Sequence, residues 1–211
     1  MITLSEIEDV FDINRQIGMW QSQQFINGPW ASYQRELTDT DLKEHLAGKI
    51  WIATRPRGAT LANIGSGSTT RWLIIDIDDH GDRSDRYGPV ESRLQTILRI
   101  LNIATPIVFS STRGQGKHIY YKCSKELPIN KLLVPVVNFF LEKNIFIAKD
   151  GIEIHPGQGH PFRLPFGRMQ VLERIGPFRY KKLLTGLNAF IEIRNHLHEI
   201  MPLQPSLLSE K

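Results

Sequence analysis

The sequence contains very little cysteine. Cys123 carries the one thiol among 211 residues. One cysteine cannot form an internal disulfide, which needs two, and it cannot form a zinc site built from several thiolates. Both are therefore excluded, and no zinc is expected. A chain without disulfides is typical of a reducing compartment, and we predict a cytoplasmic protein.

Long hydrophobic runs are missing as well. No segment approaches the roughly 18 apolar residues of a membrane span, and the first residues carry acids instead of the basic and apolar regions of a signal peptide. We therefore expect no membrane partner. Lys and Arg total 26 against 22 Asp and Glu, so the charge permits a polyanionic partner without requiring one.

The hydrophobic content is still sufficient for a core, at 41% of all residues. Because a domain commonly holds about 100–200 residues, we predict a single domain over residues 1–211. Residues 1–48 are expected to be helical, with Thr38 capping the last helix of this part. Residues 49–170 are expected to form the sheet core, and residues 171–211 to be mainly helical.

Within the sheet core, short β-like runs alternate with helical patterns. Two helices are predicted, at residues 89–103 and 129–143, and Pro135 is expected to kink or interrupt the second. Strands are predicted at residues 49–54, 71–78, 106–111, 117–122 and 151–156. This order of elements predicts an α+β fold with mixed or antiparallel sheets flanked by helices.

Asp76 and Asp78 follow an apolar run that predicts a buried strand. Residues two apart on a strand point to the same face, so the two carboxylates are expected side by side while Ile77 enters the core. Such carboxylates repel each other unless a cation neutralises them, and their hard oxygens suit Mg²⁺ or Mn²⁺. The alternative is a solvated acidic strand end. An EF-hand calcium loop is excluded, since its twelfth position would be Tyr87 instead of Glu.

A glycine-rich turn, SSTRGQGKH, lies between two predicted strands. Its backbone N–H groups and the side chains of Arg113, Lys117 and His118 can converge on phosphate oxygens. It is not a Walker A loop, because Ser111 stands where the first glycine of that motif belongs. The alternative is a hairpin turn that merely carries charge.

The segment GIEIHPGQGHPFRLPFG holds a third candidate carboxylate, Glu153. Alternation places Glu153 opposite the isoleucines on either side of it, and His155 is expected on the face of the isoleucines. Arg163 lies in a short apolar run, where a guanidinium is unusual unless it is paired or contacts a phosphate. The alternatives are an exposed strand residue for Glu153 and a salt bridge for Arg163.

In this order, the segments IIDID, SSTRGQGKH and IEI followed by RLPFG resemble the catalytic motifs of the archaeo-eukaryotic primase superfamily, in particular its plasmid, phage and mobile-element primase-polymerases. The resemblance covers residues 72–167. It implies a primase-polymerase catalytic core with an RRM-like catalytic half. It also implies that Asp76, Asp78 and Glu153 are catalytic residues that hold two Mg²⁺ or Mn²⁺ ions.

The same resemblance implies a set of nucleotide-binding residues. They come from the glycine turn and the later arginine: Ser111, Thr112, Arg113, Gly116, Lys117, His118 and Arg163. Whether Ser111 or Thr112 supplies the hydroxyl that contacts the triphosphate stays open, because Arg113 stands where many relatives have serine.

The implied function is that of a DNA-dependent nucleotidyltransferase, a primase or primer-extending polymerase that incorporates NTPs or dNTPs by two-metal phosphoryl transfer. Its partners would be a single-stranded DNA template, a primer, and a helicase or other replication and repair proteins. Relatives often carry a zinc module that helps to start primers, and this chain is too poor in cysteine for one. The resemblance therefore leaves open whether the protein starts primers or only extends them.

Two functions of other classes compete with this one. A metal-dependent nuclease or relaxase-like replication initiator would need a His-x-His pair, and His196 and His198 have that spacing. Their segment has a helical pattern, in which residues two apart diverge by about 200°, so they cannot share a metal. The other rival is a non-catalytic nucleic-acid-binding subunit, against which the three acids argue.

Overall fold

The computed structural model describes most of the chain, namely residues 3–11, 18–22, 31–32, 36–54, 68–78, 88–110, 116–148, 151–156, 162–167, 169–176 and 179–208. Its helices are α1 (Leu4–Phe11), α2 (Asp39–Leu46), α4 (Val90–Ile100), α5 (Ile129–Glu142) and α6 (Gly186–His196), with short 3-10 turns η2 (Leu197–Glu199) and η3 (Pro205–Leu208). Its strands are β1 (Gly18–Ser22), β2 (Ala31–Ser32), β3 (Ile50–Thr54), β4 (Thr69–Ile77), β5 (Pro106–Ser110), β6 (Lys117–Pro128), β7 (Ile152–His155), β8 (Phe162–Arg163), β9 (Gln170–Gly176) and β10 (Arg179–Thr185).

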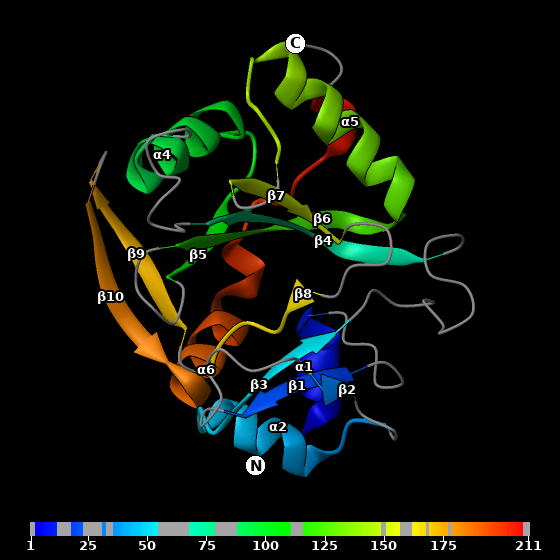
Figure 1. Cartoon of the computed structure of the whole chain (residues 1–211), viewed down its shortest axis with the longest axis vertical. Coiled ribbons are helices and arrows are strands. Elements are labelled where there is room, and N and C mark those ends of the chain that lie inside the picture. The colour runs from blue at the N-terminus through cyan, green and yellow to red at the C-terminus, as the bar shows by residue number, and fades with distance from the viewer. Residues whose placement is uncertain are drawn as a thin grey trace.

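The strands form two sheets. One has six strands in the order β10-β9-β5-β6-β4-β7, and the other has four in the order β2-β1-β3-β8. Neighbouring strands pair antiparallel in both. Helices α4 and α5 cover one face of the larger sheet, and the smaller sheet lies on its other side with α1 and α2 (Figure 1). The predicted α+β fold with antiparallel sheets and flanking helices is confirmed.

Strand β4 is buried on both faces, so its residues divide between two cores. Leu73, Ile75 and Ile77 belong to the core under α4 and α5. Trp72 and Ile74 belong to the core between the two sheets, together with residues of α1 and α6. Because side chains alternate along a strand, the next residue on the inter-sheet face is Asp76.

The two ends of the chain contain more strand than predicted. The part before Gly48 contains the pair β1 and β2, and Gln170–Gly176 and Arg179–Thr185 form the antiparallel pair β9-β10 instead of a helix. β9 pairs with β5, and its Val171 and Leu172 are buried in different cores. The long-range pairing with β5 therefore determines that β9 is a strand, which the local sequence pattern did not predict.

Two helix predictions have different outcomes. Thr38 caps α2 as predicted, since its hydroxyl accepts from the N–H of Asp41 and the Asp41 carboxylate accepts from the N–H of Thr38. Pro135, which was expected to kink or interrupt the second helix, does not interrupt it, and α5 continues through this residue. The carbonyl that loses its N–H donor there belongs to the exposed Lys131 and can be hydrated.

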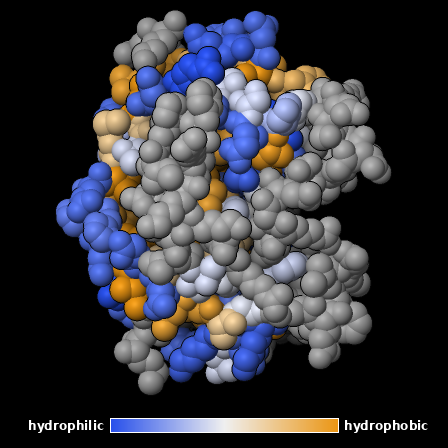
Figure 2. Space-filling model, turned by 90° about the vertical axis from the view of Figure 1, so that its left-hand side faces the viewer, coloured by the Kyte–Doolittle hydropathy of each residue, from blue (hydrophilic) through white to orange (hydrophobic). Residues whose placement is uncertain are grey.

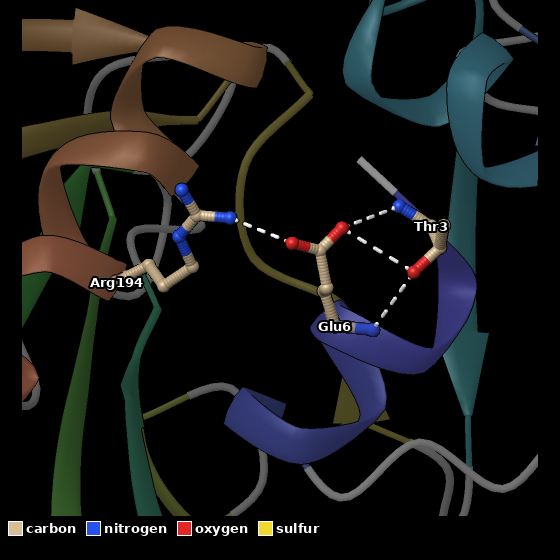
Figure 3. A network of polar contacts seen from close by, with 3 residues as sticks. All are labelled: Thr3, Glu6 and Arg194. Carbon is tan, nitrogen blue, oxygen red and sulfur yellow. Dashed lines mark hydrogen bonds and ion pairs between the residues drawn. The ribbon is translucent and has the colours of Figure 1, made fainter. Parts of the chain in front are cut away.

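A polar network joins the first and last helices (Figure 3). The Glu6 carboxylate accepts from the backbone N–H of Thr3 at 2.8 Å and from Arg194 Nη1 of α6, also at 2.8 Å. The hydrogen bond from Thr3 is the main reason why the pKa of Glu6 lies below its ordinary value. Glu6 therefore stays ionised while it caps α1 and contacts α6.

Among the residues coloured in Figure 2, hydrophilic and hydrophobic areas alternate over the surface. Among the residues whose burial the structure describes, five large hydrophobic side chains are exposed: Val134, Leu141, Phe146, Leu187 and Met201. In the described part of the chain, no helix has both the length and the apolar composition needed to cross a membrane.

We expect Gly186→Ala to destabilise the fold strongly. Gly186 has a φ of +56°, and an added Cβ would lie 2.4 Å from the carbonyl oxygen of Leu46 at the end of α2. Left-handed strain and overpacking together should cost about 3 kcal/mol of unfolding free energy. Urea unfolding would measure the loss. Gly88→Ala is the matched control, because Gly88 has a φ of +72° and an added Cβ there meets nothing within 4 Å; an equal loss in both variants would contradict the role of the clash.

Candidate active site

Three predicted site residues lie in one row across the larger sheet. Asp76 of β4 pairs with His118 of β6 on one side and with Glu153 of β7 on the other. Paired residues of neighbouring strands share a face, and their Cβ atoms lie about 4.5–5.5 Å apart. The strand register thus brings the three separate sequence motifs together on the inter-sheet face.

Asp78 extends this row beyond the end of β4. Its backbone N–H donates to the carbonyl of Gly151 at 3.0 Å, which continues the pairing of β4 with the segment before β7. Its carboxylate acts on His118, whose pKa it raises in part. Asp78 therefore lies near the same face as Asp76, as the predicted alternation requires.

His118 is a buried imidazole beside a carboxylate. Its Nδ1 lies 3.4 Å from Oδ1 of Asp76, and only 7% of the His118 side chain is exposed. Burial lowers the pKa of His118 to about 3, with Arg163 and His155 adding to this effect and Asp78 opposing it. The imidazole is accordingly neutral near pH 7, with one N–H to donate and one nitrogen to accept.

His155 also belongs to this face, and its predicted position among the isoleucines was wrong. It lies two residues after Glu153 on β7, so the two share a face, and its Nε2 is 3.5 Å from Oε2 of Glu153. Its Nδ1 is buried with no hydrogen-bond partner among the described residues. The alternation rule, applied to residues 153 and 155, would have identified it from the sequence.

Lys117 is not brought together with these residues. It pairs with Ile77 and Ser110, which places it on the opposite face of the sheet from His118. Its Nζ lies 3.3 Å from Oε1 of Glu91 on α4, and 9% of its side chain is exposed. Consecutive residues of a strand diverge, so the side chains of Lys117 and His118 cannot converge on one phosphate from within β6.

The rest of the glycine turn is described only at its end. Gly116 is buried and directly precedes β6. Ser111, Thr112 and Arg113 lie outside the described residues, so their predicted contacts with a triphosphate stay predictions.

Arg163 comes from the other sheet. It lies in β8 opposite Ala53, and its carbonyl accepts from the hydroxyl of Tyr120 at 2.9 Å. Its guanidinium is centred 5.4 Å from the ring of Trp51, a cation-π distance. Because it also lowers the pKa of His118, its charge reaches the space between the sheets.

The histidine pair of the nuclease alternative does not form a site. His196 ends α6 and pairs with Glu192 at 3.5 Å, whereas His198 lies in η2 and pairs with Glu199 at 3.7 Å. The two imidazoles thus face different carboxylates on an exposed surface.

The acids have the right chemistry for a divalent cation, although their side chains are not gathered around one point. Within the described ranges no three carboxylate, imidazole or thiolate groups lie close enough together to hold a metal. Asp76 and Glu153 each face an imidazole at 3.4 and 3.5 Å. Asp76, Asp78 and Glu153 nevertheless offer hard oxygen donors from adjacent backbone positions, a set that suits Mg²⁺ or Mn²⁺.

Comparison with known proteins found matches among solved structures. No protein-family model and no curated protein matches this sequence. Among solved structures, the archaeo-eukaryotic primase domain of the primase-polymerase of cyanophage S-2L is 10% identical, with 96% of this chain and 92% of that chain covered and a TM-score of 0.45. The polymerase domain of Mycobacterium tuberculosis ligase D, in complex with DNA, is 11% identical, with 98% and 88% covered and a TM-score of 0.46.

Proposed function

We propose that this protein is a metal-dependent nucleotidyltransferase of the primase-polymerase type, which incorporates NTPs or dNTPs on a single-stranded DNA template. One observation carries the proposal: Asp76 lies between His118 and Glu153 on three adjacent strands. These residues come from three motifs that are far apart in the sequence. Their joint position on one face is what a triphosphate site with acidic metal ligands requires.

In the proposed site the three acids hold divalent cations. Asp76, Asp78 and Glu153 are the ligands, and bound Mg²⁺ or Mn²⁺ would supply the positive charge that stabilises the attacking and leaving oxygens. Asp76 and Glu153 are partly exposed, at 21% and 32% of their side chains, so both are accessible to an ion.

His118 and Arg163 hold the triphosphate in this proposal. Arg163 provides a permanent positive charge from the opposite sheet. The Nδ1 of His118 lies 3.4 Å from the Asp76 carboxylate. To donate to that carboxylate and to a phosphate oxygen at once, His118 needs both of its N–H groups, and the negative charge of a bound triphosphate would favour this protonated form. A primer 3′-hydroxyl, or that of an initiating nucleotide, would attack the α-phosphorus, and the bond to the β-phosphate oxygen would break with release of diphosphate. The side chains of the site fix the triphosphate for this in-line attack. Lys117 is not part of the proposed site.

The proposal is tested by nucleotide incorporation. Purified protein would receive labelled NTPs or dNTPs and single-stranded DNA, with and without a primer, in Mg²⁺ or Mn²⁺. We expect template-directed products that require the metal, and the reactions without primer would separate priming from extension. Failure to incorporate any nucleotide in all these reactions would refute the proposal. In a parallel reaction with end-labelled DNA and unlabelled nucleotides, shortening of the DNA would instead support the nuclease alternative. Binding of DNA without either reaction would support a non-catalytic subunit.

A further inference from the structure

One buried arginine lies directly behind the acidic row. Arg93 is on α4, and only 9% of it is exposed. Its Nη1 donates to the carbonyl of Gly151 at 2.8 Å, and its Nη2 donates to the carbonyl of Asp78 at 2.7 Å. One guanidinium therefore contacts both chain segments that carry the acids at this edge of the sheet.

These two hydrogen bonds control the backbone next to two proposed metal ligands. Asp78 is itself a ligand, and Gly151 lies two residues before Glu153. The carbonyl of Gly151 also accepts from the N–H of Asp78 at 3.0 Å. The forked guanidinium thus closes a small network that fixes the end of β4 against the start of β7.

Packing alone does not explain an arginine at this position. The buried residues beside it on α4 include Val90, Leu94 and Ile97, which are apolar and pack into the core of the sheet. A buried guanidinium loses its hydration, and only good hydrogen bonds compensate for this. The bonds that Arg93 makes to Asp78 and Gly151 go to the part of the backbone from which the acids project.

We propose that Arg93 is a positioning residue for the divalent cation, because it sets the spacing of the backbone segments that carry Asp78 and Glu153. This inference rests on the proposed function. Arg93 itself touches no metal or substrate in this scheme. Its loss should weaken cation binding more than it weakens the fold.

A cavity beside Arg93 makes a direct rescue experiment possible. It has a volume of about 320 Å³ and lies between α4 and the segment before β7; its lining includes Arg93, Thr96, Asn144 and Ile152. In Arg93→Ala, a small guanidinium compound can enter from this cavity and restore the two hydrogen bonds. Methylguanidinium at millimolar concentration is a suitable probe, with urea at the same concentration as its control.

The test measures Mn²⁺ binding without nucleotide or DNA. Free Mn²⁺ would be followed by electron paramagnetic resonance in wild type, Arg93→Lys, Arg93→Ala and Arg99→Ala, with thermal unfolding recorded for each. Arg99 is the matched control, since it is exposed on the same helix. We expect the Kd for Mn²⁺ to rise roughly 10- to 100-fold in Arg93→Ala, as for other residues that orient metal ligands, and less in Arg93→Lys. Methylguanidinium should lower the Kd for Mn²⁺ again in Arg93→Ala only. The Kd of Arg99→Ala should equal that of the wild type.

The outcomes separate this inference from the function on which it rests. Folded Arg93 variants that bind Mn²⁺ as tightly as wild type would overturn the positioning role, even if wild type incorporates nucleotides. Failure of both Arg93 variants to fold, with and without methylguanidinium, would also overturn it, since the role would then be structural. A wild-type protein that neither binds Mn²⁺ nor incorporates nucleotides would refute the proposed function itself.

Discussion

Replacing Asp76 and Asp78 together with asparagine should reduce nucleotide incorporation by at least about 10³-fold, since removal of even one group that stabilises transition-state charge commonly costs 10²- to 10³-fold. Asparagine keeps the shape of aspartate and removes its charge. The substitution thus leaves the strand end intact and removes two of the three proposed anionic ligands. Primer extension with labelled nucleotides in saturating Mn²⁺ would measure the loss.

The same double variant should be at least as stable as the wild type. Two carboxylates close together on one face repel each other, and their neutral replacements do not. We therefore expect an equal or higher Tm in the absence of metal, together with loss of the increase in Tm that Mn²⁺ gives the wild type. Glu142→Gln, at the exposed end of α5, replaces one carboxylate by an amide away from the site and is a control that should change neither property. Full activity in the double variant would refute the metal role, and a lower Tm would instead indicate a structural role for the acids.

The local parts of the site could be predicted from the sequence. The apolar run before Asp76 predicts a buried strand, and alternation then predicts that Asp76 and Asp78 share a face. The strands on either side of the glycine turn follow from their β-branched and aromatic residues in the same way. The structure has strands at these positions, β4, β5 and β6.

The meeting of the three motifs could not be derived from local pattern. It depends on a register that aligns Asp76 with His118 and Glu153 across two strand pairs. A shift of one residue in either strand pair would turn His118 or Glu153 to the other face of the sheet. No local sequence signal fixes the register of these pairs. The core fixes the register instead, because a shift in either pair would also turn a buried residue, Ile119 of β6 or Ile152 of β7, away from the core under α4 and α5.

Side-chain alternation along a strand bears on two of the predicted positions. Lys117 and His118 were both predicted to contact phosphate, although consecutive strand residues point to opposite faces. His155 was placed away from Glu153, although residues two apart share a face. The contact between Arg93 and the backbone of Asp78 and Gly151 is of another kind, since it joins a helix to two strand ends through tertiary packing. The sequence contains no pattern for it.

The different faces of Lys117 and His118 lead to a paired prediction. His118→Gln should lower kcat/KM for the nucleoside triphosphate by about 10- to 100-fold, the usual cost of losing a group that contacts a metal ligand. The reason is that the imidazole is 7% exposed and lies 3.4 Å from the Asp76 carboxylate on the face of the proposed site. Lys117→Met should stay within about threefold of wild type. Its ammonium pairs with Glu91 on the α4 side of the sheet.

Steady-state kinetics at varied triphosphate concentration, with thermal unfolding of both variants, would separate binding from folding. Glutamine can still donate one hydrogen bond toward Asp76, so a defect that persists in His118→Gln reflects the lost imidazole and not an emptied core position. A larger loss in Lys117→Met than in His118→Gln would mean that the triphosphate approaches from the α4 side. The site would then have to be assigned to the opposite face of the sheet, where Asp76 and Glu153 could not reach it.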